Sequence, residues 1–112
     1  MLRSGNIKTV DVGSHTSDLI CPRCGGENLH HDGATFFDRS EDAPQEVVIK
    51  VHGSSASSSI QEARLTENPS SRRHGMLIHF SCETCPSPKG RINLAIAQHK
   101  GCTEISWQFD PA

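Results

Sequence analysis

The sequence reads CPRCGG at residues 21–26 and CETC at residues 82–85, and these two motifs decide its fold. Two residues between paired cysteines let both sulfurs reach one ion from a single turn. Two such pairs supply four thiolates, which satisfy a tetrahedral Zn²⁺ ion without any further ligand. The sequence therefore predicts one structural zinc site. Its ligands are Cys21, Cys24, Cys82 and Cys85.

The composition indicates the setting in which these cysteines act. The chain has 112 residues, of which 34% are hydrophobic and 4% are aromatic. A chain of this size and polarity buries a thin core, so a bound metal would help it to fold. The first residues do not resemble a signal peptide, and no stretch approaches the roughly 20 apolar residues of a membrane span. We therefore expect a soluble cytoplasmic protein, in which paired CxxC motifs bind metal rather than form disulfides.

Alternating apolar residues predict strands on both sides of the second motif. QEVVIKVH at residues 45–52 is one such strand, and residues 92–96 and 103–109 form a hairpin that turns at Lys100-Gly101. The fold is therefore expected to be mainly β, either an antiparallel sheet or a small sandwich. Its core is predicted from the apolar face of each strand: Val47, Ile49, Val51, Met76, Ile78, Phe80, Leu94, Ile96, Ile105 and Trp107.

The remaining segments divide the chain into an arm and one domain. Residues 1–19 are predicted as a polar N-terminal arm, and residues 20–112 as a β domain with a flexible, serine-rich loop near 53–75. Asp32-Gly33 is a hairpin turn signal. Residues 60–68 fit either a short capped helix or a strand.

The two cysteine motifs, each leading into or out of a predicted strand, resemble those of the zinc-ribbon class. The resemblance implies a three-stranded antiparallel sheet capped by two metal-binding turns. It also implies a structural zinc ion, with protein or nucleic-acid contacts as the usual task. Residues 25–81 form an insertion that is long for a minimal ribbon.

The first motif also resembles a rubredoxin knuckle, which implies an iron redox protein as an alternative. Rubredoxins surround the iron with aromatic side chains, whereas this chain has four Phe, one Trp and no Tyr. With either metal, four thiolates leave no open position for a catalytic water. No Gly-x-Ser-x-Gly motif is present, so we expect no enzymatic activity.

The charge pattern bears on the choice of partner. The formal net charge is −2, with acidic residues gathered in 28–52 and basic residues in 60–91. This is not the basic balance of a non-specific nucleic-acid binder. We therefore expect a non-catalytic module that binds another protein through its sheet face or its long loop. The alternative is a nucleic-acid-binding ribbon that uses Arg64, Arg72, Arg73 and Arg91.

Other residues with chemical potential have simpler interpretations. Cys102 follows the predicted turn and is interpreted as a filler or surface thiol rather than a ligand. His30 and His31 are adjacent on a strand, so their side chains point to opposite faces and do not easily share one ion. Nothing in the sequence specifies an oligomeric state.

Overall fold

The computed structural model describes residues 2–85 and 91–110, which form two antiparallel sheets. In chain order the elements are β1 (Leu2–Ser4), β2 (Thr9–Asp11), β3 (Ser17–Leu19), β4 (Leu29–Asp38), β5 (Gln45–His52), β6 (Ser55–Glu62), the short 3-10 helix η1 (Ala63–Leu65), β7 (Gly75–Cys82), β8 (Ile92–His99) and β9 (Cys102–Phe109). Within these described ranges, no helix is long and apolar enough to cross a membrane.

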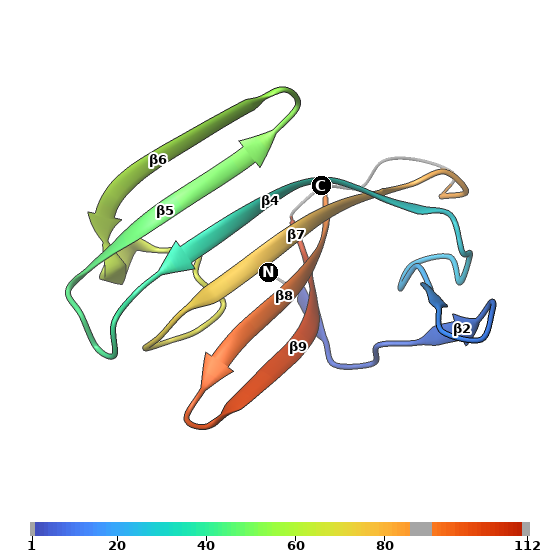
Figure 1. The fold of residues 1–112 in the computed structure, drawn as a ribbon, viewed down its shortest axis with the longest axis horizontal. Coiled ribbons are helices and arrows are strands. Elements are labelled where there is room, and N and C mark those ends of the chain that lie inside the picture. Colours follow the sequence, from blue (N-terminus) through green and yellow to red (C-terminus); the bar gives the residue numbers. More distant parts are fainter. Residues whose placement is uncertain (1, 86–90, 111–112) are drawn as a thin grey trace.

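Seven strands form one large sheet with the order β1-β9-β8-β7-β4-β5-β6, while β2 and β3 form a separate two-stranded sheet (Figure 1). The predicted hairpin between β8 and β9 is confirmed, because His99 pairs with Cys102 across Lys100 and Gly101. Lys100 adopts a positive φ of 56° in this turn. The prediction of a mainly β, antiparallel fold is confirmed.

The predicted hairpin turn at Asp32-Gly33 is wrong, because both residues lie inside β4. The pairing of β4 with β7 shifts register between His31 and Gly33, which marks a bulge. A Cβ at residue 33 would stand 2.7 Å from the carbonyl oxygen of Val51. Glycine is therefore needed here for the close approach of β5 rather than for a turn.

The serine-rich run that was expected within a flexible loop is instead β6. All eight of its residues pair with β5, from Gln45 opposite Glu62 to His52 opposite Ser55. The sequence resembles a loop because small polar side chains cover an exposed edge strand. Within residues 60–68, the strand continues to Glu62 and is followed by η1. The N-terminal arm contains β1, which pairs with β9, and the β2–β3 pair.

One face of the large sheet is covered by residues 63–74, which lead from β6 at the edge to β7 in the middle. Beneath this crossing segment lies a buried cluster of Phe37, Val48, Leu77 and Ala95. Hydrogen bonds hold the segment down: Ser70 Oγ donates to the Gln98 carbonyl at 2.7 Å. The side-chain amide of Asn68 donates to the buried carboxylate of Glu46 at 3.2 Å.

Among the residues that the structure describes, the other face is covered only at the end where β4 begins. Cys21, Phe80, Ile92 and Trp107 form a buried cluster there, against which Ile7, Leu19 and Leu29 pack. Figure 1 shows the N-terminal segment (residues 2–19), with β2, beside this end of the sheet and away from β5 and β6. The N-terminal segment therefore acts as a partial cover for the sheet.

Part of the predicted core is wrong. Phe80 and Trp107 are buried, and a further group is half-buried: Met76, Ile78, Leu94 and Ile96. In contrast, Val47, Ile49, Val51 and Ile105 are exposed. In β5 the buried side is the opposite one, with Glu46 and Val48, because the crossing segment packs on that side.

Candidate metal centre

The pairing of β4 with β7 brings the two cysteine motifs together. β4 begins three residues after the first motif, and β7 ends at the first cysteine of the second. Because the strands are antiparallel neighbours, Leu29 lies opposite Cys82. The amide of Glu83 donates to the carbonyl of Asn28 at 3.1 Å, which extends this contact beyond the strands. Two motifs far apart in sequence thus meet at one end of the sheet.

Two glycines shape the first motif. The amide of Cys21 donates to the Gly26 carbonyl at 2.8 Å, and the amide of Gly25 donates back to the Cys21 carbonyl at 3.0 Å. Gly25 has a φ of 76°, a conformation that glycine adopts without strain. A Cβ at residue 26 would stand 2.6 Å from the hydroxyl oxygen of Thr84 in the second motif. The glycines therefore permit the turn and the close approach of the two motifs.

The four sulfurs have the spacing of a tetrahedral metal site. One ligand atom from each of Cys21, Cys24, Cys82 and Cys85 lies within 4.8 Å of the others. The Cys21 and Cys85 sulfurs are 3.7 Å apart, and those of Cys24 and Cys82 are 3.5 Å apart. A tetrahedron with metal–sulfur bonds of about 2.3 Å has edges of about 3.8 Å. These two separations are close to such an edge, and the four sulfurs lie close enough together to bind one metal ion.

The cluster joins the core on one side and solvent on the other. Cys21 is buried and belongs to the cluster of Phe80, Ile92 and Trp107, whereas Cys24 is exposed. An ion held by all four sulfurs would therefore link the first motif to the hydrophobic core of the sheet.

The thiol groups differ strongly in acidity. Burial raises the pKa of Cys82, but hydrogen bonds from Thr84 and from neighbouring thiols outweigh it and lower the pKa to about 6. Burial, followed by hydrogen bonding with the other three sulfurs, raises the pKa of Cys85 to about 12. Without a cation, therefore, the cluster does not carry four thiolates together. A divalent cation favours the ionised form of each ligand and so releases protons on binding.

Thr84 contacts the sulfur cluster, and the sequence reasoning did not single it out. Its hydroxyl oxygen lies 3.2 Å from the Cys24 sulfur and 3.4 Å from the Cys82 sulfur. A hydrogen bond from this hydroxyl lowers the pKa of Cys24. Outer-shell partners of this kind orient ligands and tune a metal site. The available signal was its position between the two cysteines of the second motif.

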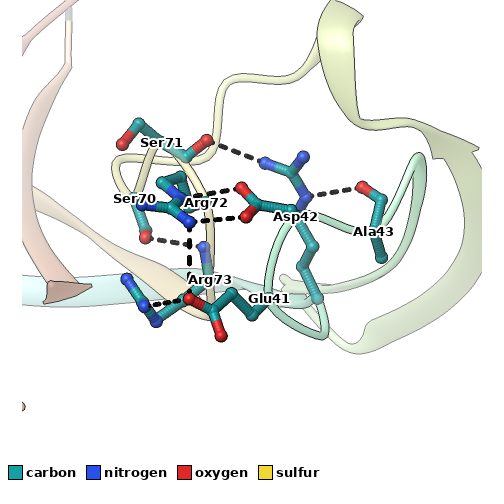
Figure 2. A network of polar contacts seen from close by, with 8 residues as sticks. Glu41, Asp42, Ala43, Ser70, Ser71, Arg72 and Arg73 are labelled. Carbon is teal, nitrogen blue, oxygen red and sulfur yellow. Dashed lines mark hydrogen bonds and ion pairs between the residues drawn. The ribbon is translucent and has the colours of Figure 1, made fainter. Parts of the chain in front are cut away.

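The arginines of the nucleic-acid alternative are all paired with carboxylates. Arg72 donates two hydrogen bonds to Asp42, at 2.7 and 2.6 Å, and Arg73 donates to Glu41 (Figure 2). Arg64 pairs with Glu62 at 2.9 Å, and Arg91 with Asp32 at 3.2 Å. The structure does not bring these four side chains together as one basic site.

Arg72 and Arg73 instead tie the crossing segment to the connection between β4 and β5. In Figure 2 their guanidinium groups face Asp42 and Glu41 across the gap between the two loops. The amide of Asp42 also donates to the Arg72 carbonyl at 2.9 Å. Arg39, which the sequence reasoning missed, donates to the Ser71 carbonyl at 2.9 Å. The uneven distribution of acidic and basic residues along the chain was the signal for this contact.

The remaining candidates lie apart from the sulfurs. Cys102 is exposed and outside the cluster. His30 pairs with Glu83 at 3.1 Å, and His31 makes an edge-on contact with Phe80. In the ranges that the structure describes, the four cysteines are the only group of three or more metal-ligating residues close enough to share an ion.

In comparisons with known proteins, no family model, curated protein or solved structure matches the chain.

Proposed function

We propose that this protein is a zinc-stabilised, non-catalytic interaction module that binds another protein. The observation that carries the proposal is the group of four sulfurs with nearly tetrahedral spacing, supplied by two CxxC motifs. Four thiolates form a closed structural zinc site, of the type found in zinc ribbons. A reducing compartment such as the cytoplasm keeps such thiols available for metal. The ion holds the first motif against the sheet and leaves the rest of the surface free for contacts.

Zinc is preferred over iron, although four thiolates accept both metals. The rubredoxin-like alternative requires a redox-active ion, and the resemblance is limited to the first motif. Elemental analysis of the purified protein separates the two metals. We expect a colourless protein with one zinc per chain, whereas a coloured protein containing iron would replace this proposal with the redox alternative.

The lack of catalysis is supported by the closed coordination and by the burial of another polar group. Thr35 Oγ1 lies 3.0 Å from His79 Nε2, and His79 Nδ1 lies 2.6 Å from Asn93 Oδ1. This series of hydrogen-bonded side chains resembles a nucleophile with its base and orienting group. However, Thr35 has only 6% of its surface exposed, so its hydroxyl is not accessible to a substrate. We interpret these three side chains as a hydrogen-bonded link between β4, β7 and β8.

A protein partner is preferred over nucleic acid because each of the candidate arginines already faces a carboxylate. Phosphate binding would have to replace those ion pairs. The test is a gel-shift titration with duplex and single-stranded nucleic acid at low salt. We expect no shift. A shift whose affinity falls by roughly 0.9 log units per log unit of salt for each contacted phosphate would establish the alternative.

A further inference from the structure

The large sheet has an uncovered apolar area, which we call the open face. It lies on the same side as Trp107, but beyond the end that the N-terminal segment covers. Its residues are Phe36, Val47, Ile49, Val51, Ile60, Met76, Ile96 and Ile105. Five of these are large aliphatic side chains with exposed fractions between 36% and 69%.

The strand register makes the open face continuous. One row of directly paired residues crosses five neighbouring strands: Ile49, Phe36, Met76, Ile96 and Ile105. Val47 and Ile60 form the adjacent pair on β5 and β6. A continuous patch of this kind differs from the isolated exposed apolar residues of most protein surfaces and marks an interaction site.

The open face has the composition of a protein core. Its strands alternate so regularly that sequence reasoning assigned this side to the interior, yet in the described part of the chain no element lies over it. A sheet with such a face is stable when another layer covers it. The missing layer must therefore come from outside residues 2–85 and 91–110.

The charges near the open face argue against an anionic ligand. Two acidic residues, Asp38 and Glu62, share this side of the sheet at the end near Val47. No lysine or arginine occupies this side of β4 to β9 in the described ranges. The chemistry that fits is an uncharged, apolar protein surface.

The face is also hollowed. Beside the bulge in β4 lies an open hollow of about 560 Å³, with a mainly apolar lining that includes Ala34, Val51, Met76 and Ile78 and also contains His31 and Asp32. Gly33 and Ala34 are small, which lowers the surface between β5 and β7 at this point. A hollow of this kind accepts an apolar side chain from a facing surface.

The size of the open face suits a modest dimer. The eight residues span six strands about 4.8 Å apart and three rows about 6.8 Å apart, so the outline of the face, including the other positions between them, is at most on the order of 500 Å² per copy. Two copies would therefore bury at most about 1,000 Å² in total, which reaches the lower limit for a specific interface. The apolar residues of the face are complementary to themselves, as a two-fold interface requires, with Asp38 and Glu62 at one end of it.

We propose that the open face is covered by the open face of a second copy of this chain. The two sheets would stack about 10 Å apart, as in a β-sandwich. This inference rests on the proposed function as an interaction module and names its partner. The side chains of Ile49 and Phe36, near the centre of the face, would become buried in the dimer.

The test compares two substitutions in the full-length, zinc-loaded protein. Ile49→Glu places a carboxylate on the open face, whereas Leu65→Glu makes the same change in charge at an exposed leucine in η1, outside the face. The molar mass is measured by light scattering and by sedimentation over a wide range of protein concentration. The wild type and Leu65→Glu are expected to dimerise alike. Ile49→Glu should weaken dimerisation by about 100-fold or more, because its charge would be buried without a partner.

Two results would overturn the inference. One is a zinc-loaded wild type that stays monomeric at the highest concentration. The other is Ile49→Glu dimerising as tightly as Leu65→Glu, which would assign the interface to another surface, such as the edge of β6. Zinc content and circular dichroism are measured on the same samples. A sample without zinc contradicts the proposed function, whereas a folded, zinc-loaded monomer contradicts only the dimer.

Discussion

Replacement of Cys82 by serine should remove the metal and most of the stability of the protein. A domain of 112 residues has a net stability of about 6–17 kcal/mol. Structural zinc contributes an apparent binding free energy of about 10–16 kcal/mol in small zinc domains. The two quantities are comparable, so loss of the ion is sufficient to unfold the chain or to leave it marginal.

The structure indicates where the loss will act first. Cys82 ends β7, and the sulfur cluster links it to Cys21, which packs in the cluster of Phe80, Ile92 and Trp107. Without the ion, the first motif loses its link through the metal to the end of β7, and the N-terminal segment is then held by the pairing of β1 with β9 and by its apolar packing. Water then reaches Trp107, which is fully buried in the native protein and is the only tryptophan of the chain.

The assay follows from that single tryptophan. Zinc per chain is measured by elemental analysis, and thermal unfolding is followed by tryptophan fluorescence. Cys82→Ser should bind no stoichiometric zinc, emit at longer wavelength and lose its cooperative transition. Cys102→Ser is the matched control, because Cys102 is exposed and lies outside the cluster. The reasoning is refuted if Cys82→Ser keeps one zinc, or if chelation leaves the wild-type fluorescence and melting temperature unchanged.

Three further predictions concern the sheet and its crossing segment. Leu77→Ala should lower the free energy of unfolding, measured with denaturant, by about 2–5 kcal/mol, because Leu77 is buried. Leu65→Ala removes an exposed leucine and should change this free energy little. Equal losses would contradict the assigned buried face. Gly75→Ala should lower the free energy of unfolding by about 1–3 kcal/mol, because the new Cβ would overlap the side-chain oxygen of Asn68. An unchanged free energy would contradict this packing. Hydrogen bonding to Arg72 lowers the pKa of Asp42 below 3.8. The stabilisation from this exposed pair is therefore present above pH 3.8 and is lost as the pH falls through the lowered pKa. In Arg72→Gln, carboxyl titration by NMR should return the pKa of Asp42 towards 3.8, and an unchanged value would exclude the pair as the cause.

The sequence alone allowed the candidate ligands and the class of fold to be predicted, because both depend on local patterns. A CxxC spacing fits one ion within a single turn, and the hairpin at Lys100-Gly101 follows from two short alternating runs. The serine-rich β6 could not be predicted in this way. Its strand conformation comes from pairing with β5, and no signal within the serines themselves indicates that partner.

What only the tertiary structure decided is which side of each strand is covered. Alternation with a period of two residues identifies two sides, but it does not say what packs on either of them. In β5 the sequence favoured Val47 and Ile49 as core, and the crossing segment instead buried Glu46 and Val48. The sequence thus determined that an apolar face exists. The path of the chain between β6 and β7 placed the crossing segment on the opposite side, so part of this face stays uncovered by the described residues.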